Sequence, residues 1–356
     1  MGIVMMGLSH KTAPVEIREK LNIPLPQLGE ALDRLKASPE LSEAVILSTC
    51  NRLEVYARPV SEKTKTLESI AGFLIERYQQ PHLENALYHC QSQLAVNHLF
   101  RVASGLDSLV VGESEILGQV KASYQFAQRH GTTGKITNVL FQRALFVGKN
   151  VRTKTAISEG SSSVGSVGVQ LAERIFGSLH QKKVLLIGAG KIAEVTARHL
   201  LSQKATDILV LNRTLEKAEE LAKLLNGKAA PLSYLSEALT EADIVICSTS
   251  SDKPIIKKHE IETLMKVRKG HSLYFIDIAL PRNVESEVHD IDNAYVYNLD
   301  DLKNIVDENM GKRKEVVQEA ESIVEKSASD FYDWIRATLE GRSHALRHTP
   351  SEKQLG

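Results

Sequence analysis

The feature that most constrains the fold of this chain is a glycine-rich turn between an apolar strand and a helix. Residues 183–187 form a short apolar run, Gly188-Ala189-Gly190 follows it, and helical periodicity continues to about Leu201. The spacing G-x-G-x-x-A in this context is typical of a dinucleotide-binding βαβ unit, whose helix N-terminus binds a pyrophosphate. A glycine turn in a cofactor-free sheet is the weaker alternative. The residues predicted to hold the pyrophosphate are Gly188, Ala189, Gly190, Lys191, Ile192 and Ala193.

Further apolar strands are predicted at 208–211, 243–248 and 273–278, with helices between them. This alternation predicts a parallel sheet with helices on both faces, a doubly wound Rossmann-type domain over residues 157–298. An NAD site usually has an acid at the end of its second strand, to bind the ribose 2′-hydroxyl. Here that strand runs into Asn212-Arg213-Thr214. These three residues are predicted to bind NADPH, with Arg213 pairing with the 2′-phosphate and Thr214 also capping the next helix. A solvated surface arginine is the alternative.

The residues before this domain show a different pattern. Strands are predicted at 3–9, 44–49 and 53–57, and helices from Pro14 to Leu21, at 67–78, at 94–104 and over most of 119–153. An α+β catalytic domain is therefore predicted for residues 1–156. After the Rossmann domain, apolar residues recur at helical spacing across 315–334, which indicates one long amphipathic helix. Residues 299–356 are predicted to form a helical dimerisation region that ends in a polar, frayed tail from Gly341. The fold class is α/β multidomain.

A cysteine lies in the predicted turn Ser48-Thr49-Cys50-Asn51-Arg52, between two strands. A rigid scaffold can present a side chain there, and Arg52 is expected to favour the thiolate. A lone cysteine is more often a small core residue, and Cys90 and Cys247 fit that description. Three cysteines are an odd, sparse set that fits a reducing compartment, so the chain is expected to be cytoplasmic.

A cysteine nucleophile and a nicotinamide together indicate a class of reaction. Hydride must be delivered to a carbonyl, and a free carboxylate is too electron-rich to accept it. A thioester is activated, and its thiolate is a stable leaving group. Cysteine with NADPH therefore indicates reduction of an acyl group to an aldehyde. Residues 98–121 add a polar loop bounded by Gly105 and Gly112, which on its own is better explained as a solvated connection.

These segments together resemble the glutamyl-tRNA reductase family, over residues 1 to about 335. The matching stretches are 7–21 (GLSHKTAPVEIREKL), 48–52, 98–121, 152–155 (RTKT) and 277–282 (DIALPR). The resemblance implies reduction of glutamyl-tRNA by NADPH to glutamate-1-semialdehyde through a thioester on Cys50, in the five-carbon route to tetrapyrroles. It also implies a homodimer and an aminomutase partner that receives the aldehyde.

The resemblance further implies residue roles. Cys50 is the nucleophile, and His98 supplies acid–base chemistry, for instance by protonating the departing ribose oxygen. Arg52 pairs with the side-chain carboxylate of the glutamyl group. The expected substrate-binding residues are Thr49, Asn51, Arg52, Ser108, Glu113, Ser114, Glu115 and Gln119. No metal is expected.

The chain departs from the family pattern at three points. Glu115 stands where glutamine is usual, Lys191 stands where glutamate is usual, and the helical C-terminal region is shorter. The first adds a negative charge beside a pocket for a carboxylate. The third shortens the region through which the resemblance implies a dimer.

Net charge and hydropathy limit the kinds of partner that this chain is expected to bind. The 44 basic and 44 acidic residues cancel, so tRNA must be bound by local patches rather than by net charge. Arg143, Lys149, Arg152 and Lys154 form one basic run, which a solvated helix face explains equally well. No run of about 18 apolar residues and no secretory signal is present, so no membrane association is expected.

Two other functions remain open. A small-metabolite NADP dehydrogenase of the shikimate-dehydrogenase type would share Asn212-Arg213-Thr214 and would need neither thiol nor RNA. A non-catalytic protein that binds nucleotide or a partner would need no intact Cys50 or His98.

Overall fold

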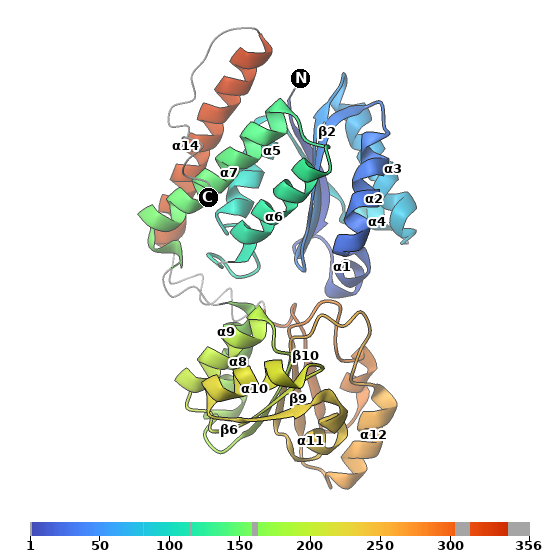
Figure 1. Ribbon diagram of the computed structural model, residues 1–356, viewed down its shortest axis with the longest axis vertical. Coiled ribbons are helices and arrows are strands. Elements are labelled where there is room, and N and C mark those ends of the chain that lie inside the picture. The colour runs from blue at the N-terminus through green and yellow to red at the C-terminus, as the bar shows by residue number, and fades with distance from the viewer. Residues whose placement is uncertain (1, 81, 114, 159–162, 303–313, 341–356) are drawn as a thin grey trace. The chain divides into compact units, whose positions relative to one another are not determined.

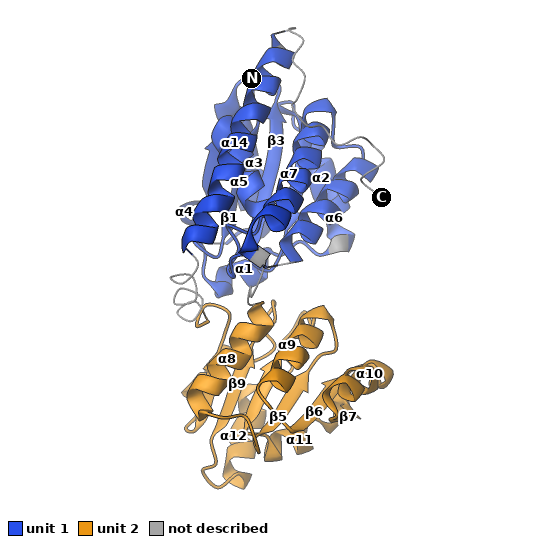
Figure 2. Ribbon diagram, turned by 90° about the vertical axis from the view of Figure 1, so that its left-hand side faces the viewer, with its two compact units in different colours: residues 1–161, 312–356 blue, residues 162–311 orange. Residues whose placement is uncertain are grey.

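The computed structural model describes residues 2–80, 82–113, 115–158, 163–302 and 314–340. Its contacts divide the chain into two compact units (Figure 2). One comprises residues 1–161 with 312–356, and the other comprises residues 162–311. The predicted polar tail from Gly341 lies outside the described residues.

The first unit is built on an antiparallel sheet of four strands in the order β2-β3-β1-β4. Three strands were expected from the sequence, and the structure confirms them. The fourth, β4, is short and half-exposed, so its sequence has no apolar alternation from which a strand could be predicted. The strands are β1 (Val4–Ser9), β2 (Leu41–Ser48), β3 (Arg52–Pro59) and β4 (Tyr88–Gln91).

Helices cover both faces of this sheet (Figure 1). On one face lie α1 (Val15–Leu21), α2 (Leu25–Lys36), α3 (Lys63–Tyr78) and α4 (Leu83–Ala86). On the other lie α5 (Gln93–Ala103), α6 (Glu115–Arg129) and α7 (Lys135–Lys154), followed by a 3₁₀ turn, η1 (Ala156–Ser158). Because both faces are covered, the strands are apolar along most of their length rather than alternating.

Gly7 sets the closeness of β1 to β3. It is opposite Glu54 in the strand register. A Cβ atom on Gly7 would lie 2.1 Å from the carbonyl oxygen of Leu53 and 2.7 Å from the Cα of Glu54. Only glycine fits this approach. The consequence is a fixed position for the stretch of β3 that carries Arg52 and Glu54.

The long helix α14 (Lys314–Leu339) belongs to the first unit. Its apolar side joins the core of that unit, and it packs on α5 and α7. The rings of Phe331 and Phe100 meet edge to face at 6.0 Å, and Arg101 pairs with Glu321. The predicted helix is therefore confirmed, but it shares the core of the first unit rather than standing apart. Its use in dimerisation stays a prediction.

The second unit is the expected Rossmann fold. Its six parallel strands have the order β10-β9-β8-β5-β6-β7, so the strand order reverses between β5 and β8. Such a reversal opens a crevice for a dinucleotide at the carboxyl ends of the strands. The strands are β5 (Lys183–Ile187), β6 (Asp207–Asn212), β7 (Lys228–Pro231), β8 (Ile244–Cys247), β9 (Leu273–Asp277) and β10 (Ala294–Tyr297).

Helices lie on both faces of this sheet as well. They are α8 (Val164–Phe176), α9 (Lys191–Ser202), α10 (Leu215–Leu225), α11 (Leu235–Glu241) and α12 (Lys258–Val267), with two 3₁₀ turns, η2 (Leu232–Tyr234) and η3 (Ser286–Asp290). Thr214 stands at the N-cap of α10 as expected, but its side chain makes no capping hydrogen bond.

Candidate active site and nucleotide pocket

Cys50 lies in the tight turn that joins β2 to β3. The turn is closed by the backbone N–H of Thr49, which donates to the carbonyl of Arg52 at 2.8 Å. The Oγ1 of Thr49 accepts from the backbone N–H groups of Asn51 and Arg52, each at 3.2 Å. Thr49 thus organises the backbone around the cysteine, as threonine commonly does in turns.

Arg18, which the sequence analysis did not single out, holds the same turn from α1. Its Nη1 donates to the carbonyl oxygen of Cys50 at 3.0 Å and to Oδ1 of Asn51 at 3.1 Å. Its Nε donates to the carbonyl of Ala13 at 3.1 Å. Arg18 is buried, so it places a fixed positive charge behind the cysteine. The only sequence signal for Arg18 is its position within residues 7–21, one of the stretches that carry the family resemblance.

The surroundings of Cys50 disfavour the thiolate form of its side chain. The residue is partly exposed. Burial and then the carboxylate of Glu113 raise the pKa of Cys50 to about 12, against the opposing charge of Arg18, and Glu115 raises the pKa further. Arg52 is not among the main influences on this pKa, so its effect on the thiol stays a prediction. Arg18 lowers the pKa of this thiol, but burial and the two acidic residues together raise it by more.

Arg52 is a buried structural ion rather than an open ligand. Its Nη1 donates to Oε1 of Glu54 at 2.7 Å, and its Nη2 donates to Oδ2 of Asp107 at 3.1 Å and to the Asp107 carbonyl. The side chain is 1% exposed. The half-exposed Lys11 also pairs with Asp107. Both ends of the guanidinium are thus occupied, which argues against the predicted direct contact of Arg52 with a substrate carboxylate.

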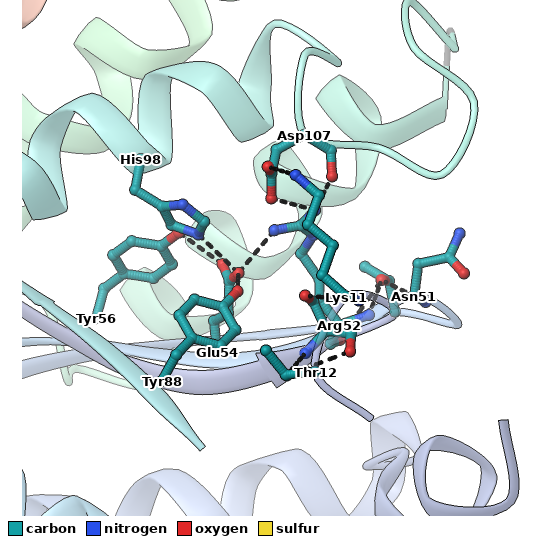
Figure 3. A network of polar contacts seen from close by, with 11 residues as sticks. Lys11, Thr12, Asn51, Arg52, Glu54, Tyr56, Tyr88, His98 and Asp107 are labelled. Carbon is teal, nitrogen blue, oxygen red and sulfur yellow. Dashed lines mark hydrogen bonds and ion pairs between the residues drawn. The ribbon is translucent and has the colours of Figure 1, made fainter. Parts of the chain in front are cut away.

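Glu54 is the centre of this buried network (Figure 3). Four side chains point at its carboxylate: Arg52, Tyr56, Tyr88 and His98. Burial by itself would raise the pKa of Glu54, but the charge of Arg52 and then the interaction with His98 hold it well below its ordinary value. Glu54 is therefore ionised, and it accepts from all four neighbours.

The predicted polar loop is buried rather than solvated. Residues 102–110 are buried, and the backbone N–H of Gly112 donates to the carbonyl of Gly105 at 3.0 Å, which closes the loop on itself. Both glycines have positive φ, 76° and 85°. Ser108 is buried in this loop, and burial raises the pKa of Glu113 at its end.

Two other predicted substrate residues follow in α6. Glu115 stands in its first turn and Gln119 one turn later, both partly exposed. The predicted Ser114 lies outside the described residues. The loop brings Glu113 close enough to Cys50 to act on its charge, and Glu115 acts on it as well.

The second unit carries a cavity of about 380 Å³ at the carboxyl ends of its strands. Gly188 lies in it with φ of 110°, and a Cβ there would lie 2.9 Å from the carbonyl of Ser248. Glycine is required on both grounds. Of the predicted pyrophosphate residues, the cavity is lined by Gly188, Ala189 and Gly190. Lys191 is exposed, Ile192 is half-buried, and Ala193 is buried in the first turn of α9. Burial of Ala193 is consistent with the helix-packing role of the third motif position.

Asn212, Arg213 and Thr214 also line the cavity, together with Lys217, which was not predicted. Arg213 and Lys217 are exposed. Nδ2 of Asn212 donates to the carbonyl of Thr214 at 3.0 Å, which shapes the turn after β6. Two cations and no carboxylate therefore face this end of the cavity among its lining residues.

The loop after β8, which was not predicted to contribute, also lines the cavity with residues 248–251. Asn283 supports it, because its Oδ1 accepts from the backbone N–H of Thr249 at 2.9 Å and from its hydroxyl at 2.8 Å. Asp277 in turn accepts from the backbone N–H groups of Ala279, Asn283 and Val284. The contact of Asn283 with Thr249 joins residues 34 positions apart, so no local sequence pattern predicts it.

The predicted basic run does not act as a single surface. Arg143 is buried and stacks over the ring of Phe146 at 5.1 Å. Arg152 donates from Nη2 to the carbonyl of Glu113 at 2.7 Å. Only Lys149 and Lys154 are exposed. Neither explanation of the run, a tRNA contact or a solvated helix face, therefore fits Arg143.

Within residues 2–80, 82–113, 115–158, 163–302 and 314–340, no cluster of three or more His, Cys, Asp or Glu side chains has the arrangement of a metal site. Among the helices of those same ranges, none combines the length and the apolar composition that spanning a bilayer requires.

Each of the two units matches a known protein family. Residues 6–155 match the family described as glutamyl-tRNAGlu reductase, N-terminal domain, and residues 170–305 match shikimate / quinate 5-dehydrogenase. The glutamyl-tRNA reductase of Idiomarina loihiensis is 43% identical over 337 residues, 95% of this chain and 79% of that protein. That of Geobacter sulfurreducens is 43% identical over 365 residues, with coverage of 100% and 84%. The solved glutamyl-tRNA reductase from Methanopyrus kandleri is 36% identical, with a TM-score of 0.53 and coverage of 95% and 82%.

Proposed function

The chain belongs to the glutamyl-tRNA reductase family, and we propose that it removes glutamate from its tRNA as a thioester on Cys50 before reducing it. It is an oxidoreductase of the first step of tetrapyrrole biosynthesis, and its second unit is an NAD(P)-binding domain. The product is glutamate-1-semialdehyde.

The observation that carries the thioester proposal is the presentation of Cys50. Cys50, a partly exposed residue, stands in a turn whose backbone is tied by Thr49 and Arg18. Cys247, by contrast, is sealed in β8 with its pKa raised well above the ordinary value by burial and by Asp277. Attack of the Cys50 sulfur on the aminoacyl ester releases the tRNA. Hydride from the nicotinamide then reduces the thioester and the thiolate leaves.

The proposed cofactor is NADPH. Support comes from Arg213 and Lys217, two exposed cations on the wall of the cavity next to the turn after β6. A 2′-phosphate would be bound there by charge-assisted contacts, which an unphosphorylated ribose cannot make.

The proposed roles of the remaining residues follow the same logic. The glutamyl group is bound by Ser108, Glu113, Ser114, Glu115 and Gln119. His98 accepts or donates a proton during the reaction. Because Arg52 is already paired with Glu54 and Asp107, we assign it to holding the pocket in shape. Lys11 also pairs with Asp107 but is half-exposed, so we assign to it the contact with the substrate carboxylate.

The proposed partners are glutamyl-tRNA, a second copy of the chain and an aminomutase that takes the aldehyde, all in the cytoplasm. Lys149 and Lys154 are the exposed cations of the basic run that can contact tRNA phosphates. Binding through phosphates would weaken steeply as salt concentration rises.

The test is NADPH oxidation with glutamyl-tRNA by the wild-type chain and by Cys50→Ser. Aldehyde formation should be lost in the variant, while NADPH binding to the other unit is retained. Ribonuclease treatment of the substrate should abolish the wild-type rate. A rate that survives ribonuclease would indicate a small-metabolite dehydrogenase of the shikimate type, and full activity of Cys50→Ser would overturn the thioester.

A further inference from the structure

The buried carboxylate of Glu54 holds one ring nitrogen of His98. Nε2 of His98 lies 2.8 Å from Oε1 of Glu54, and Figure 3 shows the other ring nitrogen turned away from the carboxylate. The ring is also held from the side, because Tyr88 meets it edge to face at 5.7 Å and donates to the same oxygen. His98 is therefore fixed in orientation as well as in position.

The hydrogen-bond count decides which nitrogen carries the proton. Glu54 is wholly buried and ionised, so it has acceptors and no donor. An Nε2 lone pair facing that oxygen would leave two acceptors in contact inside the protein. The proton must therefore sit on Nε2 and point at Glu54. Nδ1 is left as the atom of His98 that can gain or lose a proton.

We propose that Glu54 is a positioning residue for the acylation of Cys50, because it fixes His98 as the tautomer whose Nδ1 exchanges a proton with the substrate. The proposal rests on the proposed function and deepens it. Glu54 does not touch the substrate. It acts through His98, in the way that a buried carboxylate orients the histidine of a catalytic triad.

The step balances without any further reagent. The Cys50 sulfur forms a bond to the carbonyl carbon of the ester, and the bond from that carbon to the ribose oxygen breaks. The electron pair goes to the ribose oxygen. The thiol releases its proton to solvent, and the ribose oxygen takes a proton from Nδ1 of His98, which then regains one from solvent. While Nδ1 carries that proton, the imidazolium faces the Glu54 carboxylate, which stabilises it.

The experiment compares two acyl donors that differ in their leaving group. Glutamyl-tRNA leaves through a ribose alkoxide, which needs a proton. A glutamyl thiophenyl ester leaves through a thiolate, which needs none. Acylation of Cys50 in the absence of NADPH is measured for both donors with the full chain. For Glu54→Gln we expect the rate with glutamyl-tRNA to fall about 100-fold or more, while the rate with the thioester falls far less. His98→Asn should show the same imbalance.

The matched control is Tyr56→Phe. Tyr56 donates to Oε2 of Glu54 at 2.6 Å, on the oxygen that His98 does not contact. Removing that bond perturbs the same buried carboxylate but leaves the His98 contact, so the ratio of the two rates should stay at the wild-type value. The double variant Glu54→Gln/His98→Asn should be no slower than the worse single variant, since the two residues act as a unit.

Equal losses with both donors in Glu54→Gln would show that Glu54 only supports the fold of the pocket, and would overturn the proposal. Additive losses in the double variant would do the same. Failure of the proposed function looks different, because neither donor would then acylate Cys50 in the wild-type chain. If Glu54→Gln does not fold, Glu54→Asp provides the second variant. It keeps the charge but withdraws the carboxylate from Nε2, and it should show the same imbalance.

Discussion

Two buried arginines lie near Cys50, and they make different contacts. Arg18 donates to the carbonyl of Cys50 itself, while Arg52 points away into the carboxylates of Glu54 and Asp107. Sequence proximity suggested Arg52 as the activating cation, because it lies two residues from the thiol. No local pattern reveals that Arg52 is buried and ion-paired. The residue that acts on the sulfur is 32 positions away in the chain.

The reactivity of Cys50 should follow from its raised pKa. With a pKa of about 12, the thiol is protonated at neutral pH, and the thiolate fraction grows about tenfold with each pH unit. Alkylation of Cys50 by iodoacetamide in a Cys90→Ser background should therefore rise steadily from pH 7 to pH 10 without reaching a plateau. A plateau below pH 9 would show that the free enzyme already holds a thiolate.

Removing the charge of Arg18 should slow that alkylation further. Arg18→Gln removes the cation that opposes the effects of burial and Glu113 on the pKa of Cys50. The fraction of thiolate at any given pH therefore becomes still smaller. The rate of alkylation at pH 8 should fall severalfold. Lys20→Gln, a nearby exposed change on the same helix, serves as the control. An unchanged rate in Arg18→Gln would mean that the charge of Arg18 does not reach the sulfur.

Arg213 and Lys217 should set the preference for NADPH over NADH. Each charge-assisted hydrogen bond to a 2′-phosphate contributes about 1.5–3 kcal/mol, so Arg213→Ala should raise KM for NADPH roughly 10- to 100-fold by that energy. KM for NADH should hardly change, and Lys217→Ala should act in the same direction. Equal increases for both nucleotides would place these side chains away from the 2′-position.

At the scale of elements, the close pairing of β1 with β3 fixes the network around Glu54. Gly7→Ala would push its Cβ into the backbone of Leu53 and Glu54. We expect a loss of about 1–3 kcal/mol in the free energy of unfolding, and a loss of activity larger than this destabilisation explains. Urea unfolding followed by the fluorescence of Trp334, the only tryptophan, measures the first quantity.

Gly72→Ala is the control for that substitution. Gly72 lies within α3, and nothing stands within 4 Å of a Cβ placed there. Alanine has the higher helix propensity, so this variant should be at least as stable as the wild type. If Gly7→Ala were equally harmless, the contact between β1 and β3 would be looser than the structure has it.

Elements with a strong local pattern were predictable, and short edge elements were not. The bounds of β5 agree with the apolar run 183–187, and the long helix α14 agrees with its amphipathic period. The strands β4, β7 and β10 have four residues each and too little pattern to be distinguished from loops. The candidate site was predictable as a set of segments. Its bonds were not, because Glu54 and His98 are 44 positions apart.

At the scale of the whole molecule, the two units should respond to acid in opposite ways. In the first unit, Arg52 overcomes burial and lowers the pKa of both Glu54 and Asp107. Their contribution to stability is present above their ordinary values of 4.5 and 3.8 and is lost as pH falls through the lower folded values. In the second unit, burial raises the pKa of Asp277 from 3.8 to about 7. Its contribution is present below pH 3.8 and is lost as pH rises through 7.

Acidification from pH 7 towards pH 4 should therefore strengthen the second unit, and further acidification should weaken the first. Hydrogen–deuterium exchange of the strands β8 and β9 should slow between pH 7 and pH 5, after correction for intrinsic rates. Exchange in β2 and β3 should accelerate only below about pH 4. Replacement of Asp277 by Asn should abolish the slowing. A uniform response of both units would contradict the separation of their buried charges.

The most direct test of the account is mass spectrometry of the peptide that contains Cys50, taken after the chain has reacted with glutamyl-tRNA in the absence of NADPH. The account predicts a glutamyl adduct on Cys50 that disappears when NADPH is added, as the semialdehyde forms. An adduct on Cys90 instead, or aldehyde formation while Cys50 never becomes acylated, would contradict it.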